Sequence, residues 1–431
     1  MKKIRIAMLG CGAVADLYLP VFKYLPEVEL AALADLDGSR AGEMARRYGV
    51  GKVLHTAADL AKDKSIDAVI VATPPRFHAD NIAVLAGAGK HILCEKPMAH
   101  TVEDCHRIIE SCRNNGVKLQ LGHMKRFMRG NQKVKAVIDA GLLGKVFMVE
   151  CQWDVNVPGL VGTYREEAAT GGGVLQDHGP HAFDLVRWWT GSDVESISAT
   201  VRIIHPGRVN EDTAIVMAEH AGGVTGLYHM TRIFFGRAYD HDYYKIYGSE
   251  GTLVVCNEHH FPTMSLESPQ IALYGPNQQV KNLDVLHGWN IDDQVFQNSA
   301  FYSELKAFSE CILQDSEPRV TGEDGLHAME CVAASYESAF SGKRINLPFI
   351  GEQDFGTLFH ALKERELKNL GSEYRIGEEY LRLDHVPDPV LAYRPARTGE
   401  KWDPRENDMT DMASTEGLQG TLKWSDLQAS P

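Results

Sequence analysis

The chain has 431 residues, of which 44% are hydrophobic and 24% charged, a composition typical of a globular protein with two or three domains. Asp and Glu number 58 against 44 Lys and Arg, a net charge of −14 that disfavours nucleic acids and anionic membranes as partners. No apolar run approaches the roughly 18 residues that cross a bilayer. Eight cysteines without C-x-x-C spacing indicate reduced thiols, so we expect a cytoplasmic protein with no signal peptide and no metal site.

Strand and helix patterns alternate over residues 1–123. Short apolar strands without polar alternation are typical of a parallel sheet that is buried on both faces by helices. The pattern therefore predicts a doubly wound α/β domain. Strands are expected at 4–9, 28–34, 68–72, 92–94 and 118–121, and helices at 13–24, 39–48, 80–88 and 102–114.

Longer strands in succession replace this alternation over residues 124–350. They predict a second α/β domain with a large, mostly antiparallel open sheet. Residues 351–431 form an extension that begins with a predicted helix at 353–369. In the second domain, strands are expected at 144–155, 196–204, 213–220, 224–234, 243–247 and 252–256, and helices at 134–140, 173–189, 303–313 and 325–340.

A glycine-rich turn joins the first strand to the first helix and reads G-x-G-x-x-A. The first glycine permits the tight turn, the second lets the backbone approach a pyrophosphate, and the helix N-terminus attracts the phosphates. Asp35 ends the next strand, where a carboxylate can accept hydrogen bonds from both ribose hydroxyls and repel a 2′-phosphate. The motif favours NAD over NADP, and the alternative, some tolerance of NADP, rests on nearby Ser39 and Arg40. The alternative for Asp35 is a simple turn or cap residue. The predicted turn residues are Gly10, Gly12, Ala13, Val14 and Ala15.

Two further segments follow strands of the predicted parallel sheet. Thr73 and Pro74 come after one strand, and Glu95-Lys96-Pro97 after the next. Ligands of open α/β sheets bind at these carboxyl ends. We therefore expect Lys96 to be functional rather than a solvated surface charge.

Several motifs together resemble the Gfo/Idh/MocA oxidoreductases, the relatives of glucose–fructose oxidoreductase and inositol dehydrogenase. They are the glycine turn, Glu95-Lys96-Pro97, Arg126-Phe127 and the run from Gly171 to His181. With two later segments, the similarity spans roughly residues 3–349. The resemblance implies a Rossmann domain followed by an α/β domain with an open sheet. It also implies a nicotinamide cofactor, a sugar, polyol or related alcohol as substrate, and a homodimer or homotetramer.

The resemblance implies that Lys96, Asp177 and His181 are the catalytic residues. Asp177 and His181 are four residues apart, which places them on one face of a helix. His181 suits a general base, and Lys96 suits stabilisation of a developing alkoxide. Asp177 would orient His181 or bond a second hydroxyl. His178 is the rival base, and a structural Asp–His pair that caps a helix is the alternative to any catalytic role.

The remaining predicted site residues are expected on the cofactor side or the substrate side of the site. Arginine offers a planar fork for anionic groups. Trp153 is more simply interpreted as core. The resemblance implies a position near the cofactor for His78, the alternative being a surface histidine at a helix N-terminus. The cofactor side is expected to include Thr73, Pro74, His78, Glu95, Lys96, Arg126 and Arg165. The substrate side is expected to include His123, Trp153, Tyr164, His178 and His241.

Three functions fit these residues. The first is an NAD-dependent dehydrogenase for a sugar, polyol or glycoside. The second is a glycoside hydrolase that retains NAD for transient ring oxidation and uses Tyr164, Tyr244 or His241 as an extra acid or base. The third is a non-catalytic NAD-binding regulator, which would have no need for Lys96, Asp177 and His181 together. The aromatic residues of the extension argue against a fully disordered tail. We expect an arm that wraps a neighbouring subunit, the alternative being an arm that packs on its own subunit.

Overall fold

A computed structural model describes residues 3–155, 172–205, 208–233, 239–260, 265–275, 280–282, 294–351 and 355–370, and every structural statement below concerns these residues. Within them, no helix is both long and apolar enough to cross a membrane.

The N-terminal sheet has six strands, all parallel, in the order β3-β2-β1-β4-β5-β6. This order is that of a dinucleotide-binding Rossmann fold, and it confirms the predicted doubly wound sheet. The carboxyl ends of β1, β4 and β5 meet near one another at the centre of the sheet. The strands are β1 (Ile4–Leu9), β2 (Val28–Ala34), β3 (Val53–Leu54), β4 (Ala68–Val71), β5 (His91–Glu95) and β6 (Leu119–Gly122).

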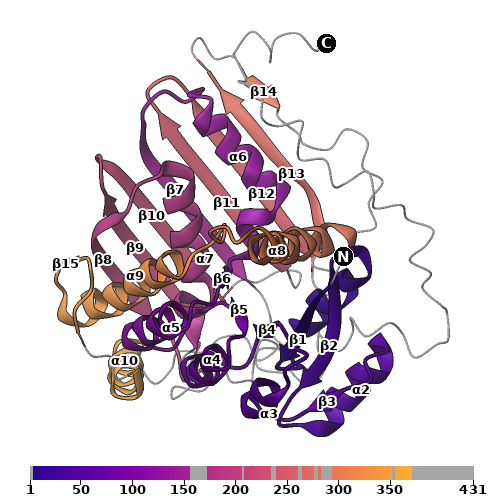
Figure 1. Ribbon diagram of the computed structural model, residues 1–431. Helices are drawn as coiled ribbons and strands as arrows, with labels where there is room; N and C mark the ends of the chain where they lie inside the picture. The colour runs from indigo at the N-terminus through magenta and orange to yellow at the C-terminus, as the bar shows by residue number, and fades with distance from the viewer. Residues whose placement is uncertain are drawn as a thin grey trace.

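Helices connect these strands and cover the sheet (Figure 1). The first differs from the expected helix at 13–24, because it consists of a short α1 (Ala15–Tyr18) followed by a 3₁₀ turn, η1 (Leu19–Tyr24). Pro20, in the first turn of η1, has no N–H to continue the α-helical ladder. The other connections are α2 (Gly38–Tyr48), α3 (Ala57–Lys62), η2 (Pro75–Phe77) with α4 (His78–Gly87), and α5 (Val102–Asn114).

The second sheet has nine strands in the order β14-β13-β12-β11-β7-β10-β9-β8-β15. Its pairs are antiparallel except β7 with β10, which run parallel at the centre, so the predicted mostly antiparallel sheet is confirmed. Three of its strands were not predicted from the sequence. The strands are β7 (Val146–Val155), β8 (Val194–Arg202), β9 (Thr213–His220), β10 (Val224–Thr231), β11 (Tyr239–Gly248), β12 (Thr252–His260), β13 (Ser265–Tyr274), β14 (Val280–Asn282) and β15 (Ile345–Asn346).

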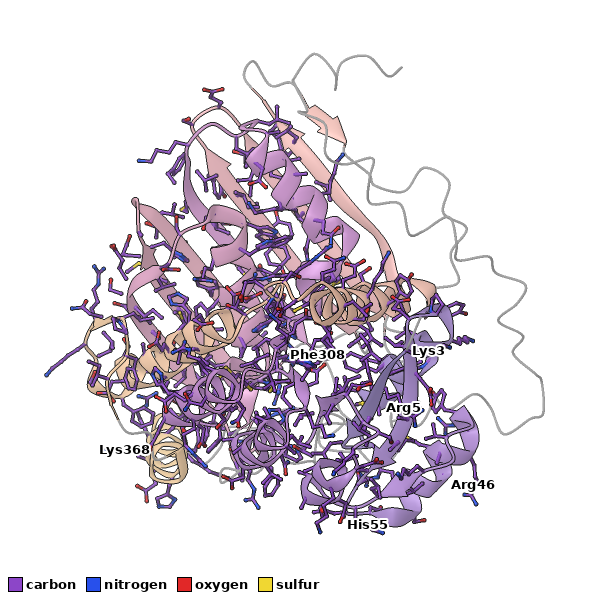
Figure 2. All side chains as sticks on the ribbon, viewed as in Figure 1. Lys3, Arg5, Arg46, His55, Phe308 and Lys368 are labelled. Carbon is purple, nitrogen blue, oxygen red and sulfur yellow. The ribbon has the colours of Figure 1, made fainter. Side chains whose placement is uncertain are left out.

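Among the described residues, helices cover one face of this sheet (Figure 1), and apolar side chains of the other face, such as Ile215 and Leu227, are exposed. One of them also packs against the Rossmann unit, where its Leu305 and Phe308 join Ile6 and Met8 of β1 in a single buried cluster. Phe308 lies near the centre of the molecule in Figure 2. The two units therefore share a core, which fixes the site between them. These elements are η3 (Met124–Phe127), α6 (Arg129–Asp139), α7 (Gly173–Thr190), α8 (Gln294–Gln314) and α9 (Gly322–Ser341).

The C-terminal extension begins with α10 (Phe355–Leu370). This helix packs on its own subunit, because Phe359 meets the ring of Tyr336 edge-on at 5.5 Å and Glu366 pairs with Arg202 of β8 at 2.6 Å. Residues 371–431 lie outside the described residues, so an inter-subunit arm stays a prediction for them alone.

Candidate active site

The glycine turn after β1 has the geometry of a phosphate-binding loop. Gly10 adopts φ +101°, and a Cβ there would lie 2.5 Å from the carbonyl oxygen of Ala72, so only glycine fits. A Cβ on Gly12 would meet nothing within 4 Å, which leaves open space above the turn. Asp35 lies directly beside it, since its Oδ2 accepts a hydrogen bond from Cys11 N at 2.7 Å.

The turn also offers unused hydrogen-bond donors. Among the described residues, the N–H groups of Gly12, Ala13 and Val14 donate to no protein acceptor. Three free N–H groups at the start of a helix, beside open space and next to a carboxylate, match the pyrophosphate and ribose of a dinucleotide. The residues present therefore fit an NAD-type cofactor. Thr73 and Pro74 border the same edge after β4, where Asn81 Nδ2 donates to Thr73 Oγ1 at 3.2 Å.

Helix α7 carries Asp177, His178 and His181, and its start explains the glycine run before it. Gly173 adopts φ +83°, and a Cβ there would lie 1.9 Å from Glu211 Oε2. The same carboxyl group accepts a hydrogen bond from Leu175 N at 2.9 Å, in the first turn of α7. Burial raises the pKa of Glu211 to about 8. The glycine thus makes room for the buried carboxyl group that fixes the start of α7.

Lys96 and Asp177 come together from the two units. Lys96 Nζ lies 3.0 Å from Asp177 Oδ1 and 3.1 Å from the Asp177 carbonyl oxygen. Arg232, just after β10, reaches the same carboxylate with Nη2 at 2.9 Å from Oδ2. One carboxylate therefore bridges two cations that come from different units.

Three imidazoles surround this ion cluster. The ring centroids of His123 and His181 are 5.8 Å apart, while Trp153 lies 5.3 Å from His178 and 5.9 Å from His181. Burial lowers the pKa of His181 well below its usual range, and the charge of Lys96 lowers it further. Burial likewise lowers the pKa of His178, to about 3. Burial lowers the pKa of His123 as well. All three rings are therefore neutral at neutral pH, the form that can accept a proton.

A buried wall closes the site on the side of the second sheet. Trp153 is fully buried, as expected for a core residue, and donates from Nε1 to the Tyr244 hydroxyl at 2.9 Å. Lys125 Nζ lies 4.7 Å from the Trp153 ring and 2.5 Å from Asp242 Oδ2. The wall therefore combines an apolar surface with a buried ion pair next to the histidines.

Three predicted cofactor residues have strong contacts within the protein. Arg126 forms a bidentate pair with Asp184 at 2.6 and 2.8 Å. Both ring nitrogens of His78 face backbone carbonyls, those of Met98 at 3.1 Å and Thr73 at 2.6 Å, so His78 is buried rather than on the surface. Glu95 is buried next to Tyr18. These contacts give each residue a role in building the site, and a direct cofactor contact stays a prediction.

Some predicted residues lie outside what the structure describes. Tyr164 and Arg165 fall in an undescribed segment, and for His241 the backbone in β11 is described but the side chain is not. Conversely, three residues of the site were not predicted from the sequence: Lys125, Arg232 and Asp242. The position of Lys125 directly before the Arg126-Phe127 motif could have indicated its place in the site. Arg232 follows β10 and Asp242 lies in β11, so both reach the site only because these strands are part of the second sheet.

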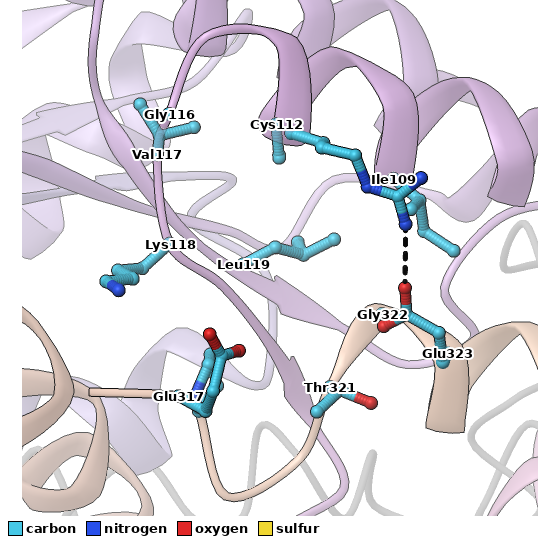
Figure 3. A pocket seen from close by; sticks show the side chains of 12 residues that line it. Ile109, Cys112, Gly116, Val117, Lys118, Leu119, Glu317, Thr321, Gly322 and Glu323 are labelled. Carbon is cyan, nitrogen blue, oxygen red and sulfur yellow. Dashed lines mark hydrogen bonds and ion pairs between the residues drawn. The ribbon is translucent and has the colours of Figure 1, made fainter. Parts of the chain in front are cut away.

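A separate hollow of about 400 Å³ opens between α5 and the segment that leads into α9 (Figure 3). Arg113 and Glu323 pair across it at 3.1 Å, and it is lined by none of the predicted site residues. Among the described residues, no three His, Cys, Asp or Glu side chains are grouped so that they could hold a metal ion.

Comparisons with known proteins identify the class of protein. Residues 4–123 match the model of the oxidoreductase family with an NAD-binding Rossmann fold, and residues 131–254 match that of the GFO/IDH/MocA C-terminal domain. The chain is 33% identical over 238 residues to the rhizopine catabolism protein MocA of Rhizobium meliloti, a match that covers 54% of this chain and 73% of that protein. The chain belongs to the Gfo/Idh/MocA oxidoreductase family.

Two further relatives cover most of the two units. The scyllo-inositol 2-dehydrogenase (NAD(+)) of Bacillus subtilis is 27% identical over 352 residues, which are 80% of this chain and 96% of that protein. The crystal structure of aldose-aldose oxidoreductase from Caulobacter crescentus, complexed with glycerol, superimposes with a TM-score of 0.69 and 26% sequence identity. The match covers 80% of this chain and 100% of the chain in that structure.

Proposed function

We propose that this chain is an NAD-dependent dehydrogenase that oxidises a secondary alcohol of a sugar or cyclic polyol. The similarity to an inositol dehydrogenase supports the substrate class. The proposal rests on the ion pair between Lys96 and Asp177. Asp177 lies one helical turn before His181. A lysine, a carboxylate and a neutral imidazole at the carboxyl edge of a Rossmann sheet are what alcohol oxidation requires.

Each residue has a role set by its surroundings. His181 is neutral and takes the proton from the substrate hydroxyl. Lys96 stabilises the negative charge that develops on that oxygen, and Asp177 keeps the ammonium group in place. When bound, the nicotinamide supplies the acceptor for the hydride. His178 is the second choice for the base, because its ring lies against Asp177, with Nε2 3.7 Å from Oδ2.

NAD is the proposed form of the cofactor. Asp35 places a carboxylate beside the glycine turn, where it would accept hydrogen bonds from the ribose hydroxyls and repel a 2′-phosphate. The N–H groups of Gly12, Ala13 and Val14 would hold the pyrophosphate.

A homo-oligomer that uses the open sheet face is also proposed. Ile215 of β9 is 56% exposed there, whereas Val216 of β9 and Tyr228 of β10 are buried on the opposite face of the sheet. Met217, Leu227 and Tyr274 are likewise exposed apolar side chains of this sheet. An exposed apolar patch on a sheet indicates a protein interface. Light scattering of the Ile215→Glu variant tests it: dissociation supports this interface, and an unchanged mass contradicts it.

The function is tested on the purified protein by measuring NADH formation with NAD and either scyllo-inositol, myo-inositol or free sugars. Net NADH with a free polyol supports the dehydrogenase. Release of the aglycone from an aryl glycoside without net NADH would instead favour redox-assisted glycoside cleavage, and NAD binding without either reaction would favour a regulator.

A further inference from the structure

A buried hydrogen-bonded chain reaches the Lys96 segment through Glu95. The Tyr18 hydroxyl lies 2.8 Å from Glu95 Oε1 and 2.6 Å from Glu304 Oε2. The other oxygen of Glu95 accepts a hydrogen bond from the backbone N–H of Lys96 at 3.0 Å. Tyr18 and Glu304 are fully buried. The three side chains come from α1, β5 and α8, so they join the cofactor helix, the catalytic strand and the second unit.

The two hydrogen bonds of the Tyr18 hydroxyl show how many protons these three side chains share. A tyrosine hydroxyl has one proton and can donate to one carboxylate only. A contact of 2.6 Å with a second ionised oxygen would bring two acceptors together without a proton between them. One of the two carboxyl groups must therefore be protonated and donate to the Tyr18 oxygen.

The proton belongs on Glu304. Glu95 already accepts from Lys96 N, which suits an ionised carboxylate. Glu304 lies beside the apolar cluster of Tyr18, Phe301 and Phe308, and its Oε1 is buried with no partner among the described residues. A buried oxygen without a partner costs less free energy in a neutral acid than in a carboxylate. Burial and the charge of Glu95 also raise the pKa of Glu304 well above its usual range.

We propose that Tyr18 and Glu304 are positioning residues for Lys96. Protonated Glu304 donates to Tyr18, Tyr18 donates to ionised Glu95, and Glu95 holds the backbone of Lys96 in place. Only the effect on catalysis rests on the proposed dehydrogenase function. The location of the proton is independent of it.

Kinetics test the positioning role. Tyr18→Phe keeps the edge-on contact with Phe301 at 4.8 Å but removes the hydroxyl, and we expect kcat to fall about 10- to 100-fold through misplacement of Lys96. KM and the Kd for NAD should stay within about threefold. Glu304→Gln retains a neutral donor and should keep kcat within about threefold.

Tyr48→Phe is the matched control, because the Tyr48 hydroxyl also bonds a carboxylate of the same unit, Asp16 Oδ1 at 3.1 Å. Equal kcat in Tyr18→Phe and Tyr48→Phe would overturn the positioning role. A loss in Glu304→Gln as large as that in Tyr18→Phe would show that a charged Glu304 is needed.

Infrared spectroscopy tests the proton itself and needs no substrate. A comparison of the wild type with Glu304→Gln at neutral pH cancels the bands that both proteins share, including those of Glu211 and Glu330, whose pKa values burial raises to about 8 and about 7. The difference spectrum should contain the C=O stretch of one protonated carboxyl group, that of Glu304. Identical spectra would overturn the proposal even if the enzyme oxidises polyols. The predicted difference would support it even if no substrate is found.

Discussion

The carboxylate of Asp177 lies between two cations, with Oδ1 3.0 Å from Lys96 Nζ and Oδ2 2.9 Å from Arg232 Nη2. Lys96 comes from the end of β5 in the Rossmann sheet, whereas Arg232 follows β10 in the second sheet. The ion cluster is therefore complete only when the two units are packed together.

Asp177→Asn preserves the shape of this side chain but removes its charge. The two cations then face each other without a shared anion, so Lys96 should lose its position. We expect kcat/KM to fall by roughly 10² to 10⁴, the range for loss of a catalytic group. Steady-state kinetics measure it, with Asp193→Asn at an exposed ion pair with Arg187 as the control. Equal activity in the two variants would remove Asp177 from the mechanism.

His181→Ala should lower turnover by about 10² to 10⁴, because the general base is lost, while NAD binding stays nearly intact. His178→Ala discriminates between the rival bases in the same assay. A larger loss in His178→Ala would transfer the role to His178.

The depressed pKa of His181 sets the pH dependence of the wild-type enzyme. Protonation destroys the base, so activity is lost as the pH falls through the folded pKa, which burial places well below the usual 6.5. We expect kcat/KM to show no His181 titration between about pH 6 and 8. The free energy of unfolding changes with pH in the same direction as the activity. The unfolded histidine binds a proton below about 6.5 and the buried one does not, so stability is lost as the pH falls below that value. A decrease of kcat/KM as the pH falls through about 6.5, present in the wild type and absent in His181→Ala, would contradict this account.

Asp35→Ala should weaken NAD binding by about tenfold, the lower end of the range for a hydrogen bond to a charged group. It should weaken NADP binding less, because the repulsion of a 2′-phosphate is also removed. Calorimetric titration with both nucleotides measures the ratio, with exposed Asp80→Ala as the control. An unchanged NAD/NADP ratio would contradict the ribose assignment.

Arg126→Met should lower the free energy of unfolding by about 3–5 kcal/mol, because it leaves the buried carboxylate of Asp184 without its cation. Urea unfolding measures this. The control is Arg107→Met, whose exposed pairs with Asp80 and Asp104 are worth about 0–1 kcal/mol. A variant of normal stability that binds NAD poorly would place Arg126 at the cofactor instead.

Local sequence patterns predicted the Rossmann unit well, apart from the short elements β3 and α3, which were not predicted. Its strands are short, apolar and buried on both faces, and its helices have clear ends such as Gly49 and the cap Thr101. The second sheet was predicted less completely. Strands β13 and β14 are part of a polar stretch without a clear period, and the parallel pairing of β7 with β10 depends on contacts between distant segments.

The site shows the same division. Lys96, Asp177 and His181 belong to motifs that can be read along the chain. Arg232 and Asp242 carry no local signal, because each becomes a site residue only when its strand pairs in the second sheet. The Tyr18–Glu95–Glu304 chain was also missed, since its members are far apart in sequence and its chemistry depends on burial.

Single-turnover hydride transfer tests the central claim most directly. The protein would be mixed with NAD and inositol that carries deuterium on its carbinol carbons, and the nicotinamide would be analysed by mass spectrometry. The proposed function predicts deuterium on C4 of the reduced nicotinamide with the wild type and at least 10²-fold slower transfer with His181→Ala. Absence of label with every polyol and sugar tested, from protein that binds NAD, would contradict it.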